Sequence, residues 1–271
     1  MTPKMPCALV LIAVVALLAG PAMAAERMND KAVEQQGKQI KEGFEIWKKA
    51  LEKKKFEDAV IRGAAGTIDV REYLKSFAKD IDTFNDRFKD TKSAGTDALA
   101  LLRRASDVER RVRQQGGIST PAEWAALSTQ CKALAAAYGA VFPLESMDAT
   151  ANRLSDKELI ERLDEMGRLA KRVKGPVDDL AKKTAGMDKS ARETMKLEFD
   201  SIDRLAGEVA DRLRKGEPAS VQVSQLLAVT GSAQGKLAAL DLPQTAKHDW
   251  SLVDHAAAEV AHAFGELWTS R

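Results

Sequence analysis

Aromatic residues, prolines and cysteines are all scarce in this chain of 271 residues. Phe, Trp and Tyr together make up 5% of the sequence, and there are 8 prolines and 2 cysteines. A β-sandwich draws heavily on aromatic and β-branched residues, so this composition disfavours that fold and favours helices. The charges are nearly balanced, with 42 basic and 40 acidic residues, and nothing in that balance demands a polyanion. We therefore expect no nucleic-acid partner.

The first 24 residues have the pattern of a secretory signal peptide. Ala8 to Ala19 is an apolar run of 12 residues, Pro21 follows it, and small residues at Ala22 and Ala24 provide a cleavage site. The competing interpretation is an uncleaved anchor, but the run is shorter than the roughly 20 residues that a membrane-spanning helix needs. We expect cleavage after Ala24 and an exported protein, periplasmic or secreted, with no transmembrane segment after cleavage.

Cleavage also decides how the cysteines can be used. Cys7 lies within the predicted signal, so Cys131 would be the one cysteine of the mature chain and could form no internal disulfide. Cys131 falls in an apolar helical register and lacks the second cysteine and the histidine of a C-x-x-C-H haem motif. The sequence predicts a buried structural thiol.

The mature sequence repeats itself at an offset of 125 to 126 residues. The segment 28–31 (Met-Asn-Asp-Lys) returns at 154–157 (Leu-Ser-Asp-Lys), and Trp124 returns as Trp250. The apolar positions of four successive amphipathic patterns coincide as well. In the first repeat these stripes run from Val33 to Leu51, Val70 to Phe88, Ala98 to Val112 and Leu127 to Val141, and in the second from Leu159 to Val177, Met195 to Leu213, Val223 to Leu237 and Val253 to Leu267.

This repetition predicts an all-α protein made of two tandem four-helix bundles with up-down-up-down topology, related by internal duplication. Residues 25–143 would form repeat 1, residues 144–153 a linker and residues 154–271 repeat 2. Thr120 to Glu123 and Ser155 to Glu158 read as capping boxes at helix starts. Gly175-Pro176 and Gly216 are expected to end or interrupt helices, and Arg62 to Asp69 is expected to be a loop.

All three histidines fall on the last predicted helix. His248, His255 and His262 are spaced by seven and form a ladder with Glu259 and Glu266. Glu259-x-x-His262 has the spacing of a carboxylate–histidine metal pair, but a di-iron bundle needs such a motif from two helices. At 100° per residue the ladder lies about 120° from the apolar stripe, which predicts a solvated face. We expect no metal ligand, cofactor-binding residue or catalytic residue, and since no histidine base lies elsewhere, no enzyme.

The helix that contains Trp124 is apolar on nearly all sides. At the places that carry the ladder in the last helix, it has Ala133, Ala136 and Ala140. A helix of this kind is usually buried on more than one side, and small residues let another helix approach closely. We expect this alanine face to form an interface, with a protein partner or in self-association.

The function that these features favour is a non-catalytic interaction or structural module of the cell envelope. One alternative is a metal- or cofactor-binding helical bundle that uses the His/Glu ladder. Another is a binder of an anionic envelope polymer, because residues 28–143 hold 21 basic and 17 acidic residues, while residues 154–271 hold 18 and 20. Basic clusters at Lys48–Lys55 and Arg103–Arg113 carry this excess, although acidic residues interleave them.

Overall fold

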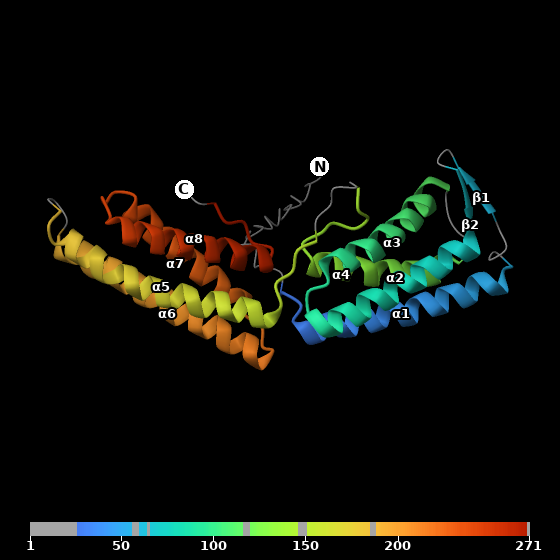
Figure 1. The fold of residues 1–271 in the computed structure, drawn as a ribbon, viewed down its shortest axis with the longest axis horizontal. Helices are drawn as coiled ribbons and strands as arrows, with labels where there is room; N and C mark the ends of the chain where they lie inside the picture. Colours follow the sequence, from blue (N-terminus) through green and yellow to red (C-terminus); the bar gives the residue numbers. More distant parts are fainter. Residues whose placement is uncertain are drawn as a thin grey trace, which may run out of the picture.

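The computed structural model describes residues 26–55, 60–63, 66–115, 120–145, 151–184 and 188–269 and shows an all-α protein (Figure 1). The predicted signal peptide lies outside these residues, as does part of the predicted linker. The helices of the described chain are α1 (Asp30–Lys53), α2 (Val70–Thr91), α3 (Gly95–Gln115), α4 (Pro121–Ala137), α5 (Asp156–Ala181), α6 (Lys189–Lys215), α7 (Ser220–Leu237) and α8 (Gln244–Ala263). None of them is long and apolar enough to cross a membrane.

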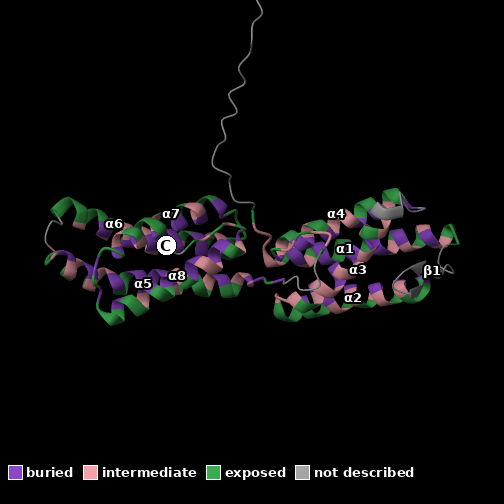
Figure 2. Cartoon of the chain, turned by 90° about the horizontal axis from the view of Figure 1, so that it is seen from above, coloured by how far each residue is buried: buried purple, intermediate pink, exposed green. Residues whose placement is uncertain are grey.

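The helices pack in two groups of four. In each group every helix contacts the next in sequence, and the first also packs against the fourth, so α1 meets α4 and α5 meets α8. Each group surrounds its own cluster of buried apolar side chains. Figure 2 shows the groups side by side along the long axis of the molecule. We call residues 26–145 the first half and residues 151–269 the second half.

The predicted apolar stripes form these two cores, except at the last position of each half. All six stripe residues of α1 are buried, as are all six of α5. Val141 and Leu267, however, are 81% and 94% exposed. Both were predicted to be buried and the prediction is wrong, because α4 ends at Ala137 and α8 at Ala263. Gly139 and Gly265 then turn the chain with φ of 67° and 66°.

The helix starts agree with the sequence in one case and differ in another. Ser155 and Glu158 form the predicted capping box at α5. Thr120 makes no capping bond to α4. Its hydroxyl instead accepts a hydrogen bond of 3.0 Å from the indole Nε1–H of Trp47, within the core of the first half. The buried indole donor needs a partner, and Thr120 satisfies it in place of the helix end.

Two further boundaries differ from expectation. Helix α5 continues through Gly175-Pro176, because its buried stripe extends on both sides at Val173 and Val177. The predicted loop at Arg62 to Asp69 contains strand β2 (Gly66–Asp69), which pairs antiparallel with β1 (Val60–Gly63). Gly216 does end a helix: it caps α6 with φ of 69°.

Candidate functional site

The two halves meet through two short extended segments. The first arm, residues 26–29, precedes α1, and the second arm, residues 151–155, precedes α5. Among the described residues no helix of one half makes more than marginal contact with a helix of the other. The arms therefore carry the junction, and the charged residues of each arm make their main polar contacts with the opposite half.

One arginine from each arm reaches across the junction. Arg27 forms an ion pair with Asp156 through Nη1, and its Nη2 donates to the carbonyl oxygen of Leu154 at 2.6 Å. Arg153 forms an ion pair of 2.6 Å with Asp30, and its Nη2 donates to the carbonyl oxygen of Met28 at 3.0 Å.

The helix starts exchange bonds in the same reciprocal manner. The backbone N–H of Asp30 donates to Oδ2 of Asp156 at 2.8 Å, and that of Asp156 donates to Oδ1 and Oδ2 of Asp30 at 3.2 and 3.1 Å. Each carboxylate thus lies at the N-terminus of the opposite helix, where the free N–H groups favour negative charge. Arg27 with Arg153, and Asp30 with Asp156, each stand 126 positions apart, so the arginine–aspartate pairs, the arginine bonds to the carbonyl oxygens of Leu154 and Met28, and the bonds between helix starts all occur in both directions.

Both arginine side chains are almost completely buried. The side chain of Arg27 is 4% exposed and that of Arg153 is 2% exposed. Burial and the neighbouring cation Arg153 lower the pKa of Arg27, and the bonded Asp156 opposes that shift. Arg153 also donates to the carbonyl oxygen of Lys92 at 2.9 Å, and its guanidinium lies 5.5 Å from the ring centre of Phe88. A buried charge with this many partners holds one geometry.

Two further arm residues, Glu26 and Ala151, contact the start of a helix in the opposite half. Glu26 accepts hydrogen bonds from the backbone N–H groups of Ala219, at 3.0 Å, and Ser220, at 3.5 Å, and so caps the start of α7. On the opposite arm Ala151 is buried, and its carbonyl oxygen would lie 2.3 Å from a Cβ added to Gly95. Only a glycine at the start of α3 leaves room for that arm.

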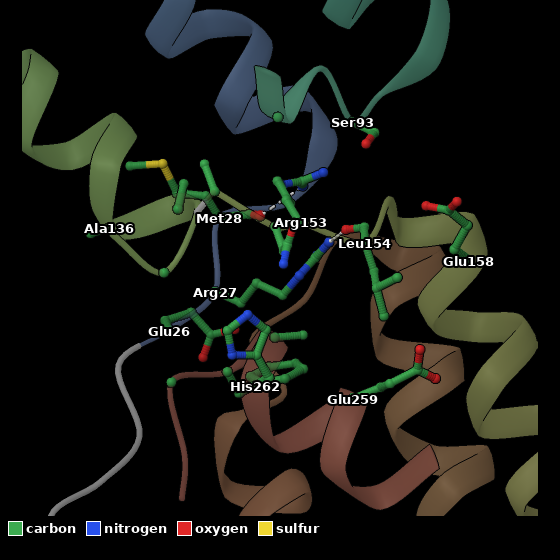
Figure 3. A pocket seen from close by; sticks show the side chains of 18 of the residues that line it. Glu26, Arg27, Met28, Ser93, Ala136, Arg153, Leu154, Glu158, Glu259 and His262 are labelled. Atoms are coloured by element: carbon green, nitrogen blue, oxygen red, sulfur yellow. Dashed lines mark hydrogen bonds between the residues drawn. The ribbon is translucent and has the colours of Figure 1, made fainter. Parts of the chain in front are cut away.

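A cleft of about 860 Å³ opens between the halves beside the arms (Figure 3). Ala136 lies on its α4 side, and Glu259 and His262 lie on its α8 side, with Arg27 and Arg153 between them. The wall residues from α4 and the turn after it are Ala133, Ala136, Ala137 and Gly139, and those from the end of the second half are Ala258, Glu259, His262, Ala263, Phe264 and Gly265. Ser93, Gly95 and Thr96, around the start of α3, line the cleft as well. The volume is within the range of ligand-binding clefts.

Several charged side chains that line the cleft are paired with an oppositely charged residue, and those that remain are acidic. Arg27 and Arg153 are paired with aspartates, while Glu26 and Glu158 also line the cleft. Hydrogen bonding by Ser155 lowers the pKa of Glu158, so that side chain is ionised at neutral pH. Glu259 pairs with Arg162 at 2.8 Å. The local balance favours a cationic ligand group.

The histidines of the predicted ladder lie on α8, while Glu266 follows the end of that helix. His248, His255 and His262 are all exposed. Glu266 accepts a hydrogen bond of 2.7 Å from the hydroxyl of Ser224, and Glu259 lies 3.8 Å from Nε2 of His255. Within the described ranges, no three His, Cys, Asp or Glu side chains are placed to hold a metal ion.

The other candidate residues have clear surroundings. Cys131 is a fully buried free thiol whose pKa is raised to about 12 by burial, so it is protonated at neutral pH. The alanine face predicted on α4 contributes Ala133 and Ala136 to the cleft, and Ala136 is exposed there. Ala140 packs partly buried against the core of the first half.

Sequence periodicity gave no sign of the junction. The residues that build it, above all Arg27 and Arg153, precede their helices and belong to no apolar stripe. One signal was available: the repeated tetrapeptide can be extended by one residue on its N-terminal side, so Arg-Met-Asn-Asp at 27–30 matches Arg-Leu-Ser-Asp at 153–156.

Comparison of the chain with models of protein families, with curated proteins and with solved structures gave no match.

Proposed function

We propose that this chain is an exported, non-catalytic interaction module, and that its cleft receives a helical segment of a protein partner. The observation that carries the proposal is the wall of small residues on α4, which faces the end of α8 across the cleft. Ala133 and Ala136 contribute almost no side-chain bulk, so a partner helix could approach the backbone of α4 closely at these two residues. At Gly139, after the end of α4, the imidazole of His262 already lies alongside. Burying the two alanines yields a modest gain each, at roughly 25 cal/mol per Å².

Charge specifies the chemistry of the partner. With both junction arginines neutralised by aspartates and Glu259 by Arg162, Glu26 and Glu158 give the cleft its acidic character. We infer a segment with small or apolar residues on one face and Lys or Arg on the other. We infer binding and not turnover, because the one cysteine of the described chain, Cys131, is buried in the core and does not line the cleft.

We further infer that the two halves are duplicated four-helix, up-down-up-down bundles, with residues 25–143 and 154–271 as the repeats and 144–153 as the linker. The equivalent helix starts at Asp30 and Asp156, and the equivalent glycine turns at Gly139 and Gly265, support this interpretation. Export through the signal at residues 1–24, to the periplasm or the medium, belongs to the same proposal.

Photo-crosslinking tests the cleft directly. A photoreactive residue at Ala133 is compared with one at Ala126, which is exposed on the same helix and does not line the cleft. In the native envelope fraction, the probe at Ala133 should capture one basic helical segment, and added salt should weaken the capture. Ala136→Arg should abolish the crosslink without changing the helicity or the melting temperature. Equal capture from both probes, or capture that Ala136→Arg leaves intact, would refute the cleft as the binding site.

A second candidate, binding of an anionic envelope polymer, rests on a groove of about 590 Å³ on the first half. Lys48, Lys75 and Lys79 line it, together with Arg71, Asp82 and other residues of α1 and α2. A polyanion such as heparin serves as the probe. Lys75→Glu with Lys79→Glu should lower its affinity, and the affinity should fall with salt. Lys157→Glu, an exposed change on the second half, is the control. Equal effects of the two sets of changes would remove this candidate.

A further inference from the structure

We propose that the junction is an isologous interface, so that either half can dock onto a second copy of itself in the way it docks onto the other half. An isologous interface uses the same patch on both partners, and each contact therefore occurs twice with the roles exchanged. The bonds between the arms have this form, although both partners belong to one chain. The inference does not depend on what the cleft binds.

The first step is that the two arms carry the same donors and acceptors. In each arm an arginine, Arg27 or Arg153, is followed by an apolar residue whose carbonyl oxygen accepts a hydrogen bond from the arginine of the other arm. An aspartate, Asp30 or Asp156, begins the helix that follows the arm and pairs with the same arginine. The apolar residues are Met28 and Leu154. The intervening residues, Asn29 and Ser155, each cap their own helix by accepting from a backbone N–H.

The second step is that the first half already receives an arginine of this kind. Its receiving site consists of Asp30, the carbonyl oxygens of Met28 and Lys92, and the ring of Phe88, and it holds Arg153. A second copy of the first half would present its own arginine, Arg27, from the same place before its own α1. The arginine and the groups that receive it are therefore all present in the first half, whereas Ala151, which packs into the first core from the second arm, would be missing from a pair of first halves.

The second half is equivalent in this respect. Its receiving site, Asp156 and the carbonyl oxygen of Leu154, holds Arg27 and would be offered Arg153 by a second copy. The receiving sites differ at one position, since Leu213 is the apolar stripe residue of α6 that matches Phe88 of α2. We therefore expect self-pairing of the second half to lack the contact between the arginine and an aromatic ring.

The third step is that pairing requires no covalent connection. Each half has its own core, with Ala151 of the second arm packed into the first one, and the junction bonds join residues of the arms with helix starts and with the end of α2. A cut between residues 145 and 151 leaves each arm attached to its own half. The test therefore uses the full chain, folded first and cut afterwards at a protease site introduced within residues 146–150.

Native mass spectrometry of the cut protein should show a complex of one first half with one second half. When cut samples of normal and isotopically heavy protein are mixed, the halves should exchange. Species containing two first halves, or two second halves, should then appear, and circular dichroism should show that helicity is retained.

The arginines provide a quantitative signature. Arg27→Ala removes one of the two arginines from a complex of unlike halves, but both from a pair of first halves. If Arg153→Ala weakens the unlike complex about 30-fold, as loss of a buried charged partner commonly does, Arg27→Ala should weaken the pair of first halves by roughly the square, about 1,000-fold, because each Arg27 would there occupy the site that holds Arg153. Arg153→Ala should leave the pair of first halves unchanged. Arg172→Ala, which removes an exposed ion pair with Asp249, is the matched control and should change neither.

Self-pairs that show this squared dependence support the proposal. Cut halves that separate into monomers, or that pair only with the unlike half, would overturn it. Self-pairs that tolerate Arg27→Ala as well as they tolerate Arg172→Ala would also overturn it, because the halves would then associate through some other surface.

Discussion

Replacing Arg153 by Ala should lower the free energy of unfolding of the intact chain by about 3 kcal/mol. The side chain is 2% exposed and makes an ion pair with Asp30 and hydrogen bonds to the carbonyl oxygens of Met28 and Lys92. Hydrogen bonds from a charged donor contribute roughly 1.5–3 kcal/mol each. Removal of one partner from a buried ion pair costs roughly 3–5 kcal/mol as a whole.

The lower end of that range applies here, because Asp30 keeps other partners. Its side chain is 19% exposed, and its carboxylate still accepts from the backbone N–H of Asp156. Arg153→Lys should recover part of the lost free energy, because an ammonium group retains the positive charge. It should not recover all of it, because only the planar guanidinium can donate to several acceptors at once in a fixed geometry.

Urea unfolding followed by circular dichroism provides the measurement, with a fit to two transitions if the two cores unfold separately. Arg172→Ala is the matched control: its side chain is 60% exposed, and its ion pair with Asp249 should contribute less than about 1 kcal/mol. The reasoning fails if Arg153→Ala costs no more than Arg172→Ala, or if Arg153→Lys is as stable as the unaltered chain.

Three further outcomes follow from burial. His255→Gln with His262→Gln should shift the free energy of unfolding by no more than about 0.5 kcal/mol, because both side chains are exposed; a larger loss in urea titrations, or a bound metal that disappears, would contradict this. Phe84→Ala should cost about 3–5 kcal/mol, since the ring is fully buried and packs against Tyr138; a loss below 1 kcal/mol would show that the first core is loosely packed. Cys131, with its pKa raised to about 12, should react with a thiol reagent at pH 8 only as fast as the chain unfolds, and rapid labelling of the native protein would count against a buried thiol.

The sequence was sufficient to predict which side chains form the cores, because helical periodicity records burial directly. The stripes from Val33 and from Leu159 are buried along their whole length. Periodicity does not record where a helix ends, and this is why Val141 and Leu267 were assigned to the cores. The glycines two residues before them, Gly139 and Gly265, were the better guide.

The candidate site was much less predictable, for a physical reason. The junction depends on two short extended segments that cross to opposite halves, and neither helical period nor composition encodes such a crossing. Thr120 illustrates the same limit at smaller scale. Its local sequence predicts a cap, but a tryptophan 73 positions away supplies the donor that it accepts from. Tertiary contacts override local preferences wherever a buried polar group requires a partner.

The two walls of the cleft differ in chemistry although their residues stand at a constant offset in the sequence. Ala133 and Ala136 on α4 stand 126 positions before Glu259 and His262 on α8, and all four residues line the cleft. The arms, by contrast, carry matching residues. The arginine–aspartate bonds between the halves are therefore symmetric, while the two walls of the cleft are not. One wall is small and apolar, and the other is polar and partly acidic. A cleft between identical halves would offer a ligand two equivalent orientations, whereas these unlike walls offer one. This asymmetry is what a single amphipathic helix, with an apolar face and a basic face, would require.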